Sequence, residues 1–232
     1  MKLRGLYPIL DAEMAAARGH DLVTCARGFA ALGLEVQQLR AKTLSGSEFL
    51  RLAERLREVV PCLIVNDRVD VALLAGAAGV HLGQDDLPAA AAQRLAPPGW
   101  VVGVSTHSLE QAQRAAADRP DYLALGPIYT TSSKLKPDPV VGVQILSAVR
   151  HAYAGPLAAI GGIQLDNCEA VWRAGADAVA VISALWMAEA PVEAARQFLL
   201  AFARVSCHSP QKSPEKTPER PPERRRGPTS LP

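Results

Sequence analysis

Eight short apolar runs alternate with stretches of helical periodicity over the first 205 residues, and this alternation constrains the fold more than any other feature. The runs are rich in Val, Ile, Leu and Ala, and most are bracketed by Gly, Pro or Asp. They show no consistently polar face, which is typical of parallel strands that helices cover. The expected strands are Gly5–Leu10, Glu35–Arg40, Cys62–Asn66, Val80–Leu82, Val101–Val104, Tyr122–Leu125, Leu157–Ile160 and Ala178–Ile182.

The segments between these runs indicate helices, because their apolar residues recur every three to four positions. Eight βα units in about 205 residues average about 26 residues each, which suits a compact (β/α)8 barrel. An open doubly wound sheet is the rival fold, but neither GxGxxG nor GxxxxGK[ST] follows the first strand. The sequence therefore predicts an α/β fold, a single-domain TIM barrel. We expect helices over Gly46–Val60, Ser108–Ala117 and Leu165–Ala174, with Ser47, Ser108 and Asp166 as capping or first-turn residues.

The last 27 residues, 206–232, differ in composition from the rest of the chain. They contain seven prolines, few apolar side chains, and six Lys/Arg against three Glu. A segment of this kind has too little apolar surface to form a packed core. We therefore expect residues 206–232 to be a disordered tail that follows a catalytic barrel domain of residues 1–205.

The charge and cysteine patterns exclude several classes of protein. Residues 1–205 carry 19 Lys/Arg against 20 Asp/Glu, which argues against a nucleic-acid binder with a basic face. No apolar run reaches the length of a membrane span, and no secretory signal opens the chain. Four scattered cysteines lack CxxC spacing, so structural zinc and a disulfide framework are not expected. We expect a cytoplasmic protein without nucleic-acid or membrane partners; a homo-oligomer remains an open alternative.

Polar side chains follow the expected strands at their carboxyl ends, where barrel enzymes build their active sites. Gln38, Arg40 and Lys42 are spaced at i, i+2 and i+4, so all three face the barrel interior if the strand continues that far. Buried charge needs a partner. That partner is either a bound anion or a structural network of nearby carboxylates, and the sequence leaves both open.

Two carboxylates end neighbouring strands and should lie close together. Asp67 follows the run LIVN, and Asp86 follows GVHLGQD. Mg²⁺ suits such a pair, since it prefers oxygen ligands and takes one or two carboxylates plus substrate phosphates. The alternative is that Asp85 or Asp86 caps the helix that starts near Pro88.

A phosphate site is expected after the seventh and eighth strands. Gly161–Gly162 allows a backbone to approach a ligand closely, and Ile182–Ser183 is placed to open a helix. These two loops and a helix N-terminus form a recurrent phosphate site in TIM barrels.

The chain resembles the family of thiamine-phosphate synthases and thiazole tautomerases, and the resemblance covers nearly all of residues 1–203. The matching segments are LYPILD (6–11), QLRAK (38–42), LIVNDRVDVALLAGAAGVHLGQDDLP (63–88), GVSTH (103–107), GPIYTTSSK (126–134), AIGGI (159–163) and AGADAVAVISAL (174–185). The family's usual acid between Arg and Lys is Ala41 here, and its usual Pro and Thr in the sixth-strand loop are Thr130 and Ser133.

The resemblance implies a transferase of thiamine biosynthesis. It joins 4-amino-2-methyl-5-hydroxymethylpyrimidine diphosphate to a thiazole phosphate and releases pyrophosphate and thiamine phosphate. By the same resemblance, Asp67 and Asp86 hold one Mg²⁺ per active site, and the catalytic residues are Arg40, Lys42, Ser105 and Lys134. The pyrimidine diphosphate is bound by Gln38, Leu39, Arg40, Ala41, Lys42, Asn66, Ser105 and Lys134. The thiazole phosphate is bound by Thr131, Ser132, Ser133, Gly162, Ile182 and Ser183.

Two other functions remain as alternatives. A thiazole tautomerase of the same family would isomerise the thiazole phosphate, with His107 as a proton shuttle, although a structural role for His107 at a helix start is equally open. The second alternative is an inactive ligand-binding homologue. GQDD and TTSSK favour coupling, because a metal-binding acid and a pyrophosphate lysine are needed only when a diphosphate leaves.

Overall fold

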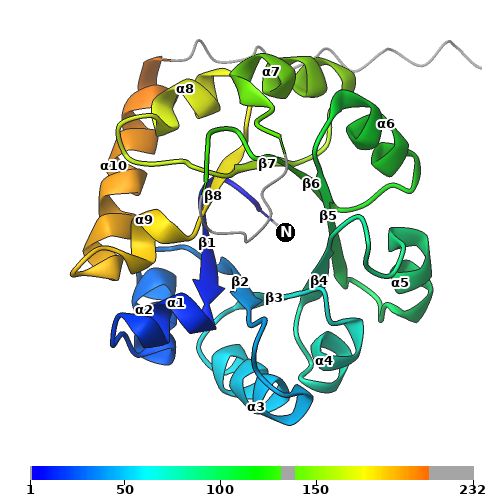
Figure 1. The fold of residues 1–232 in the computed structure, drawn as a ribbon, viewed down its shortest axis with the longest axis vertical. Helices are drawn as coiled ribbons and strands as arrows, with labels where there is room; N and C mark the ends of the chain where they lie inside the picture. The colour runs from blue at the N-terminus through cyan, green and yellow to red at the C-terminus, as the bar shows by residue number, and fades with distance from the viewer. Residues whose placement is uncertain (1, 132–138, 209–232) are drawn as a thin grey trace, which may run out of the picture.

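The computed structural model describes residues 2–131 and 139–208, in which eight parallel strands close into a barrel (Figure 1). Each strand pairs with the next one along the chain, and β8 pairs with β1. The predicted TIM barrel is therefore confirmed. The strands are β1 (Gly5–Asp11), β2 (Val36–Arg40), β3 (Cys62–Asn66), β4 (Gly79–Leu82), β5 (Val101–Thr106), β6 (Tyr122–Leu125), β7 (Leu157–Ile160) and β8 (Ala178–Val181).

The helices form a ring outside the strands (Figure 1). This arrangement follows from the apolar character of both strand faces, one of which packs inside the barrel and the other under the helices. The described helices are α1 (Ala12–Ala17), α2 (Leu22–Ala31), α3 (Gly46–Arg57), α4 (Val69–Leu74), α5 (Ala89–Leu95), α6 (Leu109–Ala117), α7 (Gly142–Ala152), α8 (Cys168–Arg173), α9 (Ser183–Trp186) and α10 (Pro191–His208).

Two of the three residues expected as caps or in first turns are confirmed. Ser47 lies in the first turn of α3, and the cap itself is Ser45, whose hydroxyl accepts from the Glu48 backbone N–H while Glu48 reaches back in a capping box. The expected helix from Leu165 begins only at Cys168, so Asp166 is not its cap. Ser108 does cap α6, accepting from the Gln111 backbone N–H.

Two buried clusters hold the barrel together. The outer cluster lies between strands and helices and includes Phe29, Phe198 and Trp186. The inner cluster fills the barrel and includes Tyr7, Ile64, Tyr122 and several alanines. Alternate residues along the strands supply the two clusters, as pleated strands require, except that β4 adds only to the outer cluster.

Gly103 makes room for Tyr122, one of the two tyrosines of the inner cluster. A Cβ atom at Gly103 would lie only 2.1 Å from the Cζ atom of Tyr122. The Tyr122 ring is fully buried and packs edge-on against Tyr7, with ring centroids 5.9 Å apart. Glycine on β5 therefore allows Tyr7 and Tyr122 to pack side by side inside the barrel.

The division into a barrel of residues 1–205 and a tail of residues 206–232 stays a prediction. Helix α10 continues through His208, and residues 209–232 lie outside the described part of the chain. Among the described residues, no helix has the length and apolar character needed to cross a bilayer.

Candidate active site

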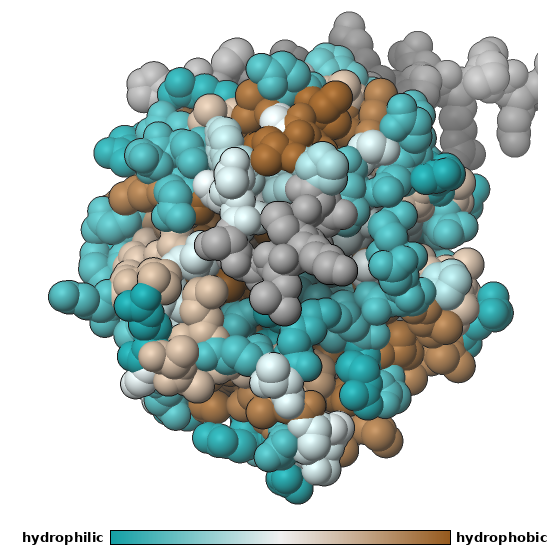
Figure 2. Space-filling model, in the orientation of Figure 1, coloured by the Kyte–Doolittle hydropathy of each residue, from teal (hydrophilic) through white to brown (hydrophobic). Residues whose placement is uncertain are grey.

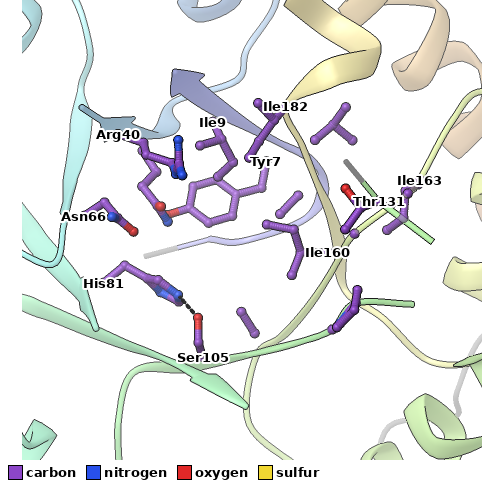
Figure 3. A pocket seen from close by; sticks show the side chains of 18 of the residues that line it. Tyr7, Ile9, Arg40, Asn66, His81, Ser105, Thr131, Ile160, Ile163 and Ile182 are labelled. Carbon is purple, nitrogen blue, oxygen red and sulfur yellow. Dashed lines mark hydrogen bonds between the residues drawn. The ribbon is translucent and has the colours of Figure 1, made fainter. Parts of the chain in front are cut away.

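A pocket opens at the carboxyl ends of the strands and is lined by residues from all eight βα units. The pocket and the open space at its mouth together have a volume of about 980 Å³. Polar side chains lie along one side of it, where Arg40, Asn66, His81 and Ser105 point inward (Figure 3). The other side is formed by Thr131 and by three isoleucines, Ile160, Ile163 and Ile182 (Figure 3).

The two cations predicted after β2 each meet a carboxylate. Arg40 forms an ion pair with Asp11, whose other oxygen accepts from the Met14 N–H at 2.9 Å and caps α1. Asp11 is nearly fully buried, and the Arg40 side chain is 19% exposed. The carboxylate network is thus present, and Arg40 also lines the pocket where an anion would bind.

Lys42 does not share the inward face of Gln38 and Arg40, because β2 ends at Arg40. Its ammonium group instead forms an ion pair with Asp67, and its side chain is 50% exposed. An ion pair this open to solvent contributes only about 0–1 kcal/mol. The same ammonium group can therefore exchange Asp67 for a ligand anion at little cost.

Asp67 and Asp86 come together at the mouth of the barrel, as the sequence predicted. Asp67 has a φ of 63°, a strained conformation for a residue other than glycine, and its N–H donates to the His81 carbonyl at 2.8 Å. Burial raises the pKa of Asp86 above its ordinary value, and the neighbouring Asp67 carboxylate raises it further, against the lowering effect of the Gly83 N–H.

Asp86 is not a helix cap. Its carboxylate accepts from the Gly83 backbone N–H at 2.7 Å, and the N-cap position of α5 is Pro88, which receives no side-chain bond. The capping alternative is therefore wrong for Asp86, whose carboxylate bonds within its own loop.

A paired carboxylate site of this kind fits Mg²⁺. Two adjacent carboxylates repel each other, and a divalent cation between them would relieve that repulsion. Within residues 2–131 and 139–208, no group of three or more His, Cys, Asp or Glu side chains gathers to hold a metal ion. Two carboxylates are what Mg²⁺ commonly takes from a protein when substrate phosphates supply the rest.

The predicted phosphate loops also meet at the pocket. Gly161 and Gly162 both have positive φ, and a Cβ at Gly162 would lie 2.4 Å from the Thr130 carbonyl oxygen. Only glycine allows this close packing of the β7 and β6 loops. Helix α9 begins at Ser183, and Ile182, Ser183 and Thr131 line the pocket. Ser132, Ser133 and Lys134 lie outside the described residues.

Two of the predicted pyrimidine-binding residues turn their side chains elsewhere. Leu39 is fully buried and Ala41 nearly so, and both pack in the outer cluster. Gln38 and Asn66 do line the pocket.

Sequence reasoning missed three residues on the floor of the pocket: Tyr7, His81 and Tyr122. Tyr7 and His81 line the pocket, and Tyr122 lies fully buried behind them. His81 Nε2 lies 2.8 Å from the Ser105 hydroxyl, a bond drawn dashed in Figure 3. A polar residue inside the apolar run GVHLG was the available signal for His81.

His107 precedes α6, as its helix-start interpretation requires. Its backbone N–H donates to the Gln111 side chain at 2.7 Å, and its Nδ1 lies 2.5 Å from the Gly126 carbonyl oxygen. The ring also lines the pocket. His107 thus connects the start of α6 to the loop after β6.

The comparisons with known proteins agree with one another. A family model described as thiamine monophosphate synthase matches residues 6–185. A thiamine-phosphate synthase from Koribacter versatilis is 44% identical over 204 residues, covering 86% of this chain and 96% of the relative. Another from Methanoculleus marisnigri is 46% identical over 199 residues, covering 84% of this chain and 92% of the relative.

A solved structure gives the same result. Thiamine phosphate pyrophosphorylase from Pyrococcus furiosus superposes with a TM-score of 0.77 at 33% identity, covering 88% of this chain and 97% of that chain.

Proposed function

The chain belongs to the thiamine monophosphate synthase family, and we propose that it couples hydroxymethylpyrimidine diphosphate to a thiazole phosphate. The products are thiamine phosphate and pyrophosphate. The observation that supports this reaction most is the Asp67–Asp86 carboxylate pair beside Lys42, which follows β3 and β4 at the same end of the barrel where the pocket opens.

The polar side of the pocket is the proposed diphosphate subsite. Arg40 presents a planar fork to phosphate oxygens and Lys42 a point charge. The pyrimidine diphosphate is assigned to Gln38, Leu39, Arg40, Ala41, Lys42, Asn66, Ser105 and Lys134. Leu39 and Ala41 take part through their backbone, because their side chains pack outward. The thiazole phosphate is assigned to the opposite side, with Thr131, Ser132, Ser133, Gly162, Ile182 and Ser183.

One Mg²⁺ per site is part of the proposal, with Asp67 and Asp86 as its protein ligands. When bound, it would neutralise charge on the diphosphate. The exposed Lys42–Asp67 ion pair supports this arrangement, because Lys42 loses little when Asp67 acquires another partner.

The reaction needs no general base. The bond between the pyrimidine methylene carbon and a pyrophosphate oxygen breaks, and its electron pair leaves with pyrophosphate. The electron-rich aminopyrimidine delocalises the positive charge that remains. The lone pair of the thiazole nitrogen then forms the new carbon–nitrogen bond. Arg40, Lys42 and Ser105 stabilise the departing charge, and the apolar wall holds the rings in line.

The cytoplasm is the proposed location, and four free cysteines support it. The proposed partners are small phosphorylated molecules.

A comparison of Asp86→Asn with Asp85→Asn tests the metal-bearing subsite. Asp86→Asn removes a charge from the carboxylate pair, so coupling at limiting Mg²⁺ should fall by about tenfold or more. Asp85 is exposed, and its replacement is the matched control that should leave the rate unchanged. Full Mg²⁺-dependent activity in Asp86→Asn would remove Asp86 from the proposed site.

A further inference from the structure

Four hydrogen bonds form one continuous chain across the floor of the pocket. Gln38 Nε2 donates to the Tyr7 hydroxyl at 3.1 Å, and the Tyr7 and Tyr122 hydroxyls lie 2.9 Å apart. The Tyr122 hydroxyl lies 2.9 Å from His81 Nδ1, and His81 Nε2 lies 2.8 Å from the Ser105 hydroxyl. The chain therefore connects a proposed pyrimidine contact, Gln38, to a proposed pyrophosphate contact, Ser105.

Burial determines which group donates and which accepts in each hydrogen bond of this chain. Tyr7 and Tyr122 are at most 1% exposed, and burial raises the pKa of both phenols. Each hydroxyl thus keeps its single hydrogen and donates it in a hydrogen bond, because a buried donor without an acceptor is destabilising. The Tyr7 hydroxyl accepts a hydrogen bond from Gln38 and therefore donates its own hydrogen bond to the Tyr122 oxygen.

The same reasoning continues through the next two members. The Tyr122 hydroxyl accepts a hydrogen bond from Tyr7 and therefore donates its own hydrogen bond to His81 Nδ1. A neutral imidazole whose Nδ1 accepts carries its proton on Nε2, and His81 then donates to Ser105 Oγ. The His81 ring is held in this orientation by stacking on Tyr122, with centroids 5.3 Å apart and planes 24° apart.

The direction matters because Ser105 is the last member. Because the Ser105 hydroxyl oxygen accepts the hydrogen bond from His81, the hydroxyl's own hydrogen is available to donate into the pocket that Ser105 lines. Pyrophosphate oxygens only accept hydrogen bonds, so a group that stabilises the leaving pyrophosphate has to be a hydrogen-bond donor. In the reverse direction, Ser105 would donate to His81 and present lone pairs to the anion.

We propose that Tyr122 is a positioning residue that, with Tyr7, holds His81 as the Nε2–H tautomer and thereby makes Ser105 a hydrogen-bond donor to the departing pyrophosphate. The inference rests on the proposed function for the role of Ser105, but the tautomer of His81 does not depend on it.

The tautomer is measured directly by NMR of ¹⁵N-histidine-labelled protein, with the signal assigned through His81→Asn. Wild type should show a protonated Nε2 and an unprotonated Nδ1 at His81. Tyr122→Phe keeps the ring and removes the donor, so the preference should weaken. Tyr153→Phe, in a half-buried tyrosine outside the chain, is the matched control and should change nothing. A protonated Nδ1 in wild type would overturn the proposal.

A double-mutant cycle tests whether Tyr122 acts through Ser105. Tyr122→Phe should lower kcat about threefold to tenfold, the size of one neutral hydrogen bond, with little change in KM for the pyrimidine diphosphate. In a Ser105→Ala background the same substitution should cost less than about twofold, because the acting group is gone. Equal losses in both backgrounds would assign Tyr122 a purely structural role.

The two measurements separate failure of the inference from failure of the proposed function. Thiamine phosphate formation that is absent in wild type contradicts the function, while the histidine spectrum still decides the proton direction. If Tyr122→Phe does not fold, the wild-type spectrum alone still decides the tautomer, and a protonated Nδ1 at His81 overturns the proposal.

Discussion

Replacing Gly103 with alanine tests the packing that places two tyrosines beneath the pocket. A Cβ at this position would lie 2.1, 2.3 and 2.5 Å from Cζ, Cε1 and the hydroxyl oxygen of Tyr122. Ordinary contact begins near 3.4 Å, so the ring has to retreat by about 1.3 Å or the strands have to part. The ring is fully buried within the inner cluster.

The expected cost follows from overpacking a rigid core. Such insertions destabilise proteins by about 1–3 kcal/mol, and the relief of glycine's extra unfolded-state freedom returns roughly 0.4–1 kcal/mol. For a domain of this size each kcal/mol lowers Tm by about 2–4 °C. We expect Gly103→Ala to lower Tm by roughly 2–10 °C and to lower kcat, because displacing Tyr122 breaks its bond to His81.

The measurement is thermal unfolding by circular dichroism, with Gly46→Ala as the control. A Cβ at Gly46 meets nothing closer than an Arg68 side-chain nitrogen at 3.5 Å, so its Tm should hold or rise. An unchanged Tm and kcat in Gly103→Ala would refute the packing argument.

Two further predictions concern the β7 loop and the thiols. Gly162→Ala should raise the KM for thiazole phosphate in steady-state assays and lower Tm, because the residue has a φ of +64° and its Cβ would meet the Thr130 carbonyl; an unchanged KM would remove this turn from the phosphate subsite. Burial raises the pKa of Cys168 to about 11, so the thiol stays protonated at pH 8, whereas Cys207 is exposed. Iodoacetamide at pH 8 should alkylate Cys207 first by mass spectrometry, and early labelling of Cys168 would contradict its burial.

The sequence was sufficient to predict the barrel and the place of its carboxylates. Apolar runs that alternate with helical patterns require parallel strands under helices, and the observed strand ends lie within two residues of the expected ones. Asp67 and Asp86 were expected together because neighbouring parallel strands end at the same rim. Neither expectation needed knowledge of a side-chain orientation.

What the sequence left open depends on local ends and orientations. Lys42 was expected inside the barrel only if its strand continued that far, but β2 ends at Arg40, the predicted end, and the ammonium group of Lys42 meets Asp67 instead. Asp86 bonds to Gly83 within its loop, a choice that depends on the turn conformation. The sequence analysis missed Tyr7, His81 and Tyr122 on the pocket floor, because aromatic residues in strands most often only pack in the hydrophobic core. These three residues are far apart in the sequence and come together only when the barrel closes.

The most direct test of the central claim is to measure thiamine phosphate and pyrophosphate in the same reaction, from purified protein, both substrates and Mg²⁺. Coupling predicts equal amounts of the two products, formed only when both substrates and Mg²⁺ are present. Pyrophosphate without thiamine phosphate, or isomerised thiazole phosphate without coupling, would contradict the account.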